Sequence, residues 1–207
     1  MVNIKVAESA GFCFGVNRAV TAVENFLNEG KKVATLGPLI HNPAFIKQLE
    51  SRGAVIIDEP EQLPDGYELV VRTHGVTKDV YERILKLNRE FSDQTCPFVK
   101  KIQNIVNDNS TPERPLLIAG DGSHPEVMGF RSYAHGESFT FSSAEELLEM
   151  LKNGTINPKK EMFVVAQTTF SSIEFKKICE IVKKYCTNAK IFDTICNATA
   201  KRQKEAC

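Results

Sequence analysis

Residues 115–134 have the sequence PLLIAGDGSHPEVMGFRSYA, and this stretch decides the fold class. Residues 115–119 form a short, bounded apolar run, which predicts a buried strand, and residues 126–134 have helical spacing. The same order of apolar strand, polar turn and helix recurs along the chain. Such alternation is typical of strand–helix units around a largely parallel sheet, so the sequence predicts an α/β protein.

The apolar runs predict strands of three to five residues at 3–7, 32–36, 54–57, 68–72, 91–93, 115–119, 138–141, 162–166 and 190–192. Helical spacing predicts helices at 15–29, 43–52, 78–87, 97–108, 126–134, 144–152 and 171–184. In the first of these helices, Val16, Ala19, Val20, Val23 and Leu27 recur at steps of three and four residues. They form one apolar face that is expected to pack on a sheet.

Composition excludes several functional classes. The 207 residues include 26 basic and 26 acidic ones, which leave no net field to attract nucleic acid, so no nucleic-acid partner is predicted. The longest apolar runs, such as residues 163–166, are far shorter than the roughly 20 residues that cross a bilayer, which predicts no membrane span. Residues 1–6 lack the features of a secretory signal, and the expected location is therefore the cytoplasm.

Three of the six cysteines share one setting. Cys13, Cys96 and Cys196 each lie in a turn that precedes a predicted helix. A single cysteine is more often a small buried apolar residue, but the shared setting favours a common site. The repetition predicts a first segment at 1–13, lobes at 14–96 and 97–193, and the beginning of a third lobe at 194–207. Cys179 and Cys186 are predicted to be packing residues, and Cys207 is given no role.

The chemistry of this cysteine site stays open at the level of residue types. A reducing cytoplasm favours metal or redox use over disulfides, and the chain contains no Cys-x-x-Cys pair. Three thiolates suit an iron–sulfur cube that keeps one iron open for substrate. They equally suit a zinc ion completed by histidine.

Other polar residues also follow predicted strands. His41, His74 and His124 each lie in a loop that enters a helix, where a phosphate oxygen is favoured. A lone histidine in such a loop is usually a surface or capping residue, but three at equivalent places indicate one pocket at the carboxyl ends of the strands. Glu126 suits a proton donor or relay, or else a carboxylate at a helix start. Thr168 suits a hydrogen bond to a substrate hydroxyl, or else a helix cap.

Seven motifs in order carry a resemblance that covers essentially the whole chain: GFCFGV at 11–16, IHN at 40–42, THGV at 73–76, TCP at 95–97, GSHPEV at 122–127, QTT at 167–169 and DTICNAT at 193–199. Together they resemble the 4-hydroxy-3-methylbut-2-enyl diphosphate reductase family. The resemblance implies a pseudo-threefold arrangement of strand–helix lobes around a central cluster. It also implies that Cys13, Cys96 and Cys196 hold one 4Fe-4S cluster.

The resemblance further implies roles for the polar residues. His41 and His74 would bind the substrate diphosphate, and His124 would help to hold substrate and relay protons. Glu126 would supply the proton with which the hydroxyl leaves as water, and Thr168 would orient that hydroxyl. Electrons from ferredoxin or flavodoxin would then yield isopentenyl and dimethylallyl diphosphates.

Two rival functions stay open, as does the extent of the protein. A non-catalytic iron–sulfur electron carrier would need the cysteines alone, and a zinc hydrolase would use cysteine and histidine ligands with Glu126 as base. Family members continue beyond the third cysteine motif into a lobe with a Ser-Ser-Asn stretch that binds the diphosphate. Because nothing here matches that stretch, the expectation is a chain without most of the third lobe, which makes it a candidate inactive fragment.

Overall fold

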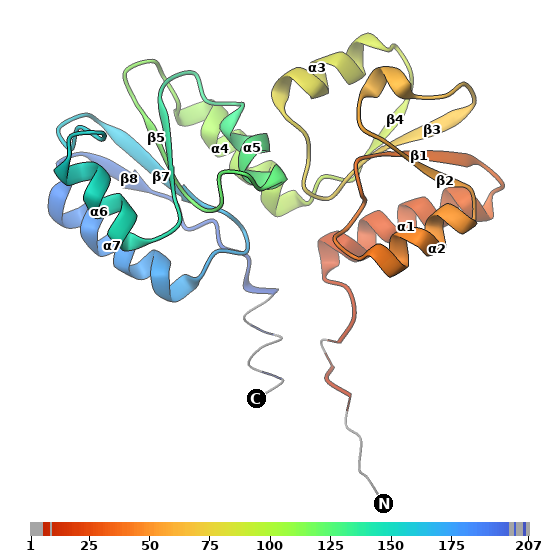
Figure 1. Cartoon of the computed structure of the whole chain (residues 1–207), viewed down its shortest axis with the longest axis horizontal. Coiled ribbons are helices and arrows are strands. Elements are labelled where there is room, and N and C mark those ends of the chain that lie inside the picture. The colour runs from red at the N-terminus through yellow and green to blue at the C-terminus, as the bar shows by residue number, and fades with distance from the viewer. Residues whose placement is uncertain (1–5, 9, 199–200, 202–204, 206–207) are drawn as a thin grey trace, which may run out of the picture. The chain divides into compact units, whose positions relative to one another are not determined.

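The computed structural model describes residues 6–8, 10–198, 201 and 205 of the chain (Figure 1). Most of the strand predicted at 3–7 lies outside these residues, and residues 6 and 7 are not in a strand. The chain divides into two compact units. The first comprises Met1–Thr73, Leu87–Cys96 and Cys196–Cys207, and the second comprises His74–Lys86 and Pro97–Ile195. The lobe boundaries predicted from the sequence, at 13, 96 and 193, stay a prediction.

The first unit contains a four-stranded sheet with the order β2-β1-β3-β4, in which every strand pair is parallel. Its strands are β1 (Lys32–Leu36), β2 (Ala54–Ile57), β3 (Tyr67–Val71) and β4 (Phe91–Asp93). Its helices are α1 (Phe14–Asn28), α2 (Pro43–Ser51) and the 3-10 turn η1 (Pro60–Gln62). Helices α1 and α2 lie side by side on one face of this sheet (Figure 1).

The apolar face predicted for the first helix is confirmed. Ala19, Val20 and Val23 are buried, and Val16 and Leu27 are partly buried against the same cluster. This cluster also includes residues of β1, β2, β3 and α2, so the helix stripe packs on the sheet as its spacing requires.

The second unit contains another all-parallel sheet, with the order β6-β5-β7-β8. Its strands are β5 (Leu116–Ala119), β6 (Ser138–Phe141), β7 (Met162–Ala166) and β8 (Ala189–Ile191). Its helices are α3 (Lys78–Lys86), α4 (Pro97–Asn109), α5 (Pro125–Arg131), α6 (Ala144–Lys152) and α7 (Ser172–Tyr185).

The two central strands of the second sheet are covered on both faces. Leu117 and Val164 belong to one core cluster, with side chains of α6 and α7. Leu116 and Val165 belong to another, with side chains of α4 and α5. The alternation along β5 and β7 therefore sends successive residues into opposite layers, which explains why both strands are continuously apolar.

The predicted fold class, α/β with mostly parallel sheets, is confirmed, and every strand pair in the two sheets is parallel. The clearest difference concerns α5, which was expected to reach residue 134 and ends at Arg131. The Ser132 hydroxyl donates to the Gly129 carbonyl at 2.5 Å and accepts the Lys78 amide at 2.8 Å. These contacts form the helix end, because a serine hydroxyl competes for backbone groups. Among the described residues, no helix has the length and apolar character needed to span a membrane.

Candidate functional site

Glu126 and Thr168 form a buried pair at the carboxyl ends of β5 and β7. Glu126 lies in the first turn of α5 and is only 3% exposed. Its carboxylate accepts the Thr168 amide at 2.7 Å and the Thr168 hydroxyl at 2.8 Å. Burial raises the pKa of the Glu126 carboxyl above its ordinary value, and the two hydrogen bonds from Thr168 offset part of that rise. The pair can therefore hold a proton and exchange it between a carboxyl and a hydroxyl oxygen.

His124 is the residue before α5, and its ring serves as the helix cap. Its Nδ1 atom accepts the Glu126 amide at 3.1 Å, which in the neutral ring leaves the proton on Nε2. The His74 and His124 rings lie edge to face, with centroids 5.5 Å apart. His74, His124, Glu126 and Thr168 all belong to the second unit. This unit alone therefore brings together four of the eight predicted site residues.

An aspartate turn fixes the entry to His124. The Asp121 carboxylate accepts the Ser123 hydroxyl at 2.7 Å and the Ser123 amide at 2.9 Å. The hydroxyl bond is the largest cause that lowers the pKa of Asp121, so this exposed group stays ionised. These two hydrogen bonds close a tight turn from Asp121 to Ser123, and the turn limits the positions available to the His124 imidazole.

Gln167 is a site residue for which sequence reasoning gave no role, although it begins the QTT motif at 167–169. Its side-chain oxygen accepts the Asp121 amide at 3.1 Å, and its backbone amide donates to the Ala119 carbonyl at 2.9 Å. Gly120 allows this approach, because a Cβ there would lie 3.0 Å from the Gln167 Cβ. The glutamine thus ties the loop after β5 to the loop after β7.

All three predicted cluster cysteines fall in the first unit, and the segments of two of them, Cys13 and Cys96, are in contact. Cys13 is the N-cap of α1, and its thiol makes no capping hydrogen bond. Gly15, in the first turn of the same helix, lies against Cys96, since a Cβ on Gly15 would stand 2.6 Å from the Cys96 sulfur. The Cys96 amide donates to the Thr73 carbonyl at 2.9 Å. The first turn of α1, which Cys13 caps, therefore lies against the turn that carries Cys96.

His41 belongs to the first unit, in the loop between β1 and α2, and is exposed. The next residue, Asn42, caps α2 by accepting the Phe45 amide at 3.1 Å. The Thr73 hydroxyl donates to the Leu39 carbonyl at 3.2 Å and ties this loop to the end of β3. His41 is thus held at the carboxyl ends of the first sheet, beside a helix N-terminus.

Cys196 follows a segment that is fixed to the second sheet. The Thr194 hydroxyl donates to the Ala166 carbonyl at 2.6 Å and accepts the Ala166 amide at 2.8 Å. The Asp193 carboxylate accepts the Ile195 amide at 3.3 Å, in a turn like the one from Asp93 to Thr95 before Cys96. Cys196 itself is half-buried and directly precedes helical residues.

Two further cysteines behave as packing residues, as predicted. Cys186 is buried in the core cluster of α6 and α7, and Cys179 is partly buried against the same cluster. Burial raises the pKa of both thiols, which keeps them protonated and unsuited to metal ligation.

The arrangement of the three predicted ligands bears on the kind of metal site. Among the described residues, the sulfurs of Cys13, Cys96 and Cys196 do not gather within 4.8 Å of one another. A tetrahedral zinc ion with bonds of about 2.3 Å needs its sulfurs within roughly 4 Å, whereas a cube binds each thiolate through a different iron. Because Gly15 has no side chain, the first turn of α1 packs directly against the Cys96 sulfur. The three thiols as placed would not hold one zinc ion together, whereas three thiolates are the donor set of a cluster with one open iron.

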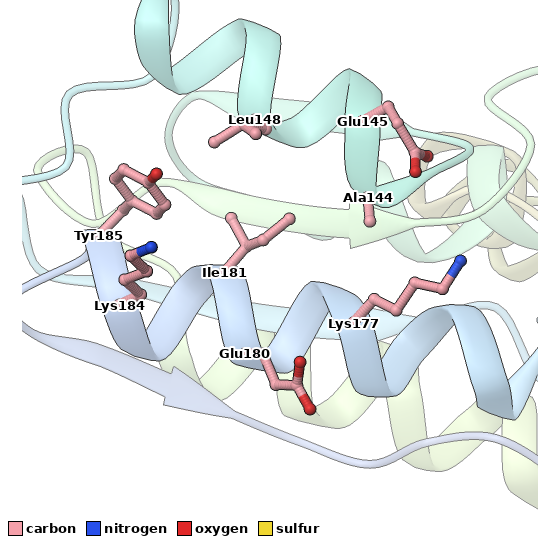
Figure 2. Close-up of a pocket in the computed structure, with 8 residues that line it drawn as sticks. All are labelled: Ala144, Glu145, Leu148, Lys177, Glu180, Ile181, Lys184 and Tyr185. Carbon is pink, nitrogen blue, oxygen red and sulfur yellow. The ribbon is translucent and has the colours of Figure 1, made fainter.

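A surface groove of about 360 Å³ lies elsewhere, between α6 and α7. Leu148 of α6 and Ile181 of α7 point into the space between the two helices (Figure 2). None of the predicted site residues lines this groove. It is a shallow gap between packed helices and takes no part in the site.

Fold and site together define an α/β protein that carries a buried acid, histidines and thiols at the carboxyl ends of parallel strands. The comparison with known families then gives a particular member of this class. A family described as LytB protein matches residues 4–207, and the chain belongs to this family. Membership implies an iron–sulfur cluster and an oxidoreductase.

Relatives named 4-hydroxy-3-methylbut-2-enyl diphosphate reductase cover nearly the whole chain. The one from Thermoanaerobacter sp. (strain X514) is 41% identical over an alignment of 210 residues, and the match covers 99% of this chain and 70% of the relative. The one from Campylobacter hominis is 40% identical over 206 residues, which are 99% of this chain and 71% of the relative.

Two solved structures of reductases are also similar to this chain. A structure titled as this reductase, the terminal enzyme of the non-mevalonate pathway, is 33% identical, with a TM-score of 0.80. The match covers 99% of this chain and 72% of that chain. A structure of the E-1-hydroxy-2-methyl-but-2-enyl-4-diphosphate reductase from Plasmodium falciparum is 28% identical, also with a TM-score of 0.80, and covers 94% and 61% of the two chains.

Proposed function

We propose that this chain reductively dehydroxylates 4-hydroxy-3-methylbut-2-enyl diphosphate to isopentenyl and dimethylallyl diphosphates. The reaction breaks one carbon–oxygen bond, consumes two electrons and two protons, and releases water. The names of relatives that are 35–41% identical over 99% of the chain support this substrate. The seven ordered motifs, which lie within the matched part of the chain, carry the same resemblance.

The observation that carries the proposal is the buried pair of Glu126 and Thr168. A departing hydroxyl needs a proton, and burial raises the pKa of the Glu126 carboxyl, which favours its protonated form. The Oε2 atom of Glu126 lies 2.8 Å from the Thr168 hydroxyl. When the carboxyl is neutral, it can donate to that oxygen, and the threonine can pass a proton on to a bound hydroxyl group.

His124 contributes from the same unit. Its Nδ1 atom accepts the Glu126 amide, so in the neutral ring the proton lies on Nε2. We assign it to holding substrate and relaying protons, and we assign His41 and His74 to the diphosphate. Both lie in loops that follow parallel strands, where helix ends and neutral or charged imidazoles favour anions.

We assign Cys13, Cys96 and Cys196 as ligands of one 4Fe-4S cluster. When bound, such a cluster supplies single electrons and an iron that acts as Lewis acid on the leaving oxygen. Cys13 caps α1, and Cys96 directly precedes α4. Ferredoxin or flavodoxin is the proposed electron donor.

The spacing of the thiols weighs against a zinc hydrolase that uses all three as ligands. Among the described residues, these sulfurs do not gather within 4.8 Å of one another, which is farther apart than one tetrahedral zinc ion allows. A simple electron carrier would have no use for a carboxyl with 3% exposure that is paired with a threonine across 42 residues.

The test compares wild type, Glu126→Gln and the control Glu149→Gln, which changes an exposed carboxyl on α6 of the same unit. Each full chain is reconstituted anaerobically, and its iron content and substrate-dependent oxidation of a chemical reductant are measured. We expect equal iron in all three and a loss of turnover of about 100-fold or more in Glu126→Gln alone. Wild type that binds no iron, or that oxidises no reductant when substrate is added, would contradict the proposed function. Equal turnover in Glu126→Gln would contradict the donor role.

A further inference from the structure

Arg18, a half-buried residue of α1, makes a contact that the functions assigned above do not use. Its Nη2 atom donates to the carbonyl oxygen of Thr95 at 2.7 Å. Thr95 directly precedes Cys96. The Nε atom of Arg18 is buried and has no hydrogen-bond partner among the described residues, and no acidic side chain described in the structure forms an ion pair with this guanidinium.

Helix α1 thus touches the Cys96 turn at two levels. Gly15 lies against the Cys96 sulfur, and Arg18, nearly one helical turn further along, holds the preceding carbonyl. Cys13 caps the same helix. A single rigid element therefore carries one predicted cluster ligand and fixes the backbone of another.

The opposite side of the turn is held by the first sheet. The Asp93 carboxylate, at the end of β4, accepts the Thr95 amide at 3.0 Å and the Thr95 hydroxyl at 2.5 Å. The Cys96 amide donates to the Thr73 carbonyl, which follows β3. With Arg18 removed, the Thr95 carbonyl would lose its contact with α1, whereas all contacts with the sheet would remain.

The charge of Arg18 also needs a compensating anion. A half-buried guanidinium without an acidic partner is costly unless an anion lies nearby. The thiolates and sulfides of a reduced cluster supply that negative charge, and a fixed cation beside them favours the state that carries one more electron. Arginine suits position 18, because its planar guanidinium is always charged and can donate a hydrogen bond to a carbonyl at the same time.

We propose that Arg18 is a positioning residue for the iron–sulfur cluster, which locks the Cys96 turn onto the helix headed by Cys13 and raises the reduction potential of the cluster. This inference rests on the proposed cluster ligation. It adds to it a residue that touches neither metal nor substrate.

The test uses the full chain, reconstituted anaerobically, as wild type, Arg18→Gln and Arg18→Lys. The control is Arg52→Gln, which changes an arginine of the same unit that contacts Asn28 and Glu24 at the far end of α1. Three quantities are measured: the midpoint potential by redox titration, the electron paramagnetic resonance spectrum of the reduced cluster, and the rate of iron loss to a chelator. Circular dichroism verifies that each variant is folded.

For Arg18→Gln we expect the equilibrium constant for one-electron reduction to fall about tenfold, which is about 59 mV to more negative potential. Iron loss should be about tenfold faster, as for other residues that orient metal ligands. Arg18→Lys should have the wild-type potential, because lysine keeps the positive charge. It should still lose iron faster than wild type, because lysine lacks the planar guanidinium that holds the Thr95 carbonyl. Arg52→Gln should match wild type in all three quantities.

The outcomes separate this inference from the proposed function. Wild type that takes up no cluster would refute the ligation itself. A wild type that carries a cluster, together with an Arg18→Gln variant of unchanged potential, spectrum and iron loss, would refute the role of Arg18 alone. If Arg18→Gln does not fold, a wild-type rate of iron loss in Arg18→Lys refutes it instead.

Discussion

Gly15 is the residue at which a single added carbon has the clearest consequence. A Cβ there would lie 2.6 Å from the Cys96 sulfur and 3.3 Å from the Cys96 Cβ, so one of the two segments must shift. We predict that Gly15→Ala lowers the iron affinity by about tenfold or more, through displacement of Cys96. Iron content after gel filtration measures this.

Gly129→Ala is the control for that substitution. Gly129 is also helical, but a Cβ there would meet its nearest neighbour at an ordinary 3.6 Å. Full iron retention in Gly15→Ala would mean that the contact between α1 and Cys96 does not matter for the cluster.

Glu126 predicts a pH dependence with a definite sign. Its pKa is raised in the folded protein, and the proposed donor is the protonated form, so turnover should fall as pH rises through that pKa. Thr168→Val removes one of the bonds that stabilise the carboxylate, so the fall should move to higher pH while the maximal rate drops roughly tenfold. Profiles of kcat against pH for both proteins measure this, and a fall at unchanged pH would contradict it.

The same group also affects stability. Because the folded pKa is raised, the stability that Glu126 contributes is full below the ordinary pKa of a glutamate and is lost as pH rises through the folded pKa. We predict that Glu126→Gln shows a flatter dependence of Tm on pH over that range than wild type does. Parallel Tm curves would show that the Glu126 proton is not linked to folding.

Residue identity alone could not decide what Glu126 does. Its position in the first turn of α5 also suits a carboxylate at a helix dipole, and both interpretations were open from the sequence. Its partner Thr168 lies 42 residues away, on another strand loop. Only the pairing of β5 with β7 brings the two loops together, and sequence spacing does not reveal that pairing. The contact of Arg18 with Thr95, 77 residues apart, was hidden for the same reason.

At the scale of elements, the local sequence pattern predicts the bounds of a helix or strand correctly where turns and caps next to it in the sequence set those bounds. Strands β1, β2, β4, β6 and β7 and helix α6 have the bounds that their sequence predicts. Turns bound the strands, and Ser143 caps α6 by accepting the Glu146 amide at 3.2 Å. The end of α5 was predicted too late, because Ser132 accepts an amide from Lys78, which is 54 residues away.

Caps give a stability prediction for α7. The Ser171 hydroxyl accepts the Glu174 amide at 3.3 Å, and the Glu174 carboxylate accepts the Ala144 amide of α6 at 2.8 Å. We predict that Ser171→Ala destabilises the protein by about 1 kcal/mol, through loss of the cap and loosening of this link. Urea unfolding measures the shift in midpoint. Ser51→Ala, at the exposed end of α2, should change it by less than about 0.5 kcal/mol, and equal shifts would exclude a specific cap effect.

At the scale of the whole molecule, the sequence predicts lobes at 14–96 and 97–193, which stays a prediction, while long-range contacts decide which segments form each compact unit. Helix α3 belongs with the second unit, although it precedes β4 of the first. Its neighbourhood explains this: the Lys100 ammonium lies 4.7 Å from the Tyr81 ring centroid, and the Gln103 amide reaches the Val76 carbonyl at 3.5 Å. Such contacts link residues that are 19 and 27 positions apart, and no local pattern encodes them.

Substitution of the cysteines gives a prediction for the molecule as a whole. The proposed ligand thiols and the buried packing thiol should have opposite effects on iron content and on Tm. Serine at Cys13, Cys96 or Cys196 should lower the iron content sharply and change the Tm of the metal-free protein little, since these residues are half-buried beside turns. Cys186→Ser should keep full iron and lower the Tm, because it places a hydroxyl in the core at a cost of about 1–3 kcal/mol.

Iron analysis and thermal unfolding of each variant, with and without the cluster, measure both responses. Binding of the cluster to the folded chain alone must raise the Tm by mass action, so wild type should show the largest difference between its two forms. Serine at any of the three ligand positions should shrink that difference, whereas Cys186→Ser should lower both Tm values and preserve it. A preserved difference in Cys96→Ser would exclude this thiol as a ligand, because a ligand that holds the cluster must contribute to the stability the cluster adds.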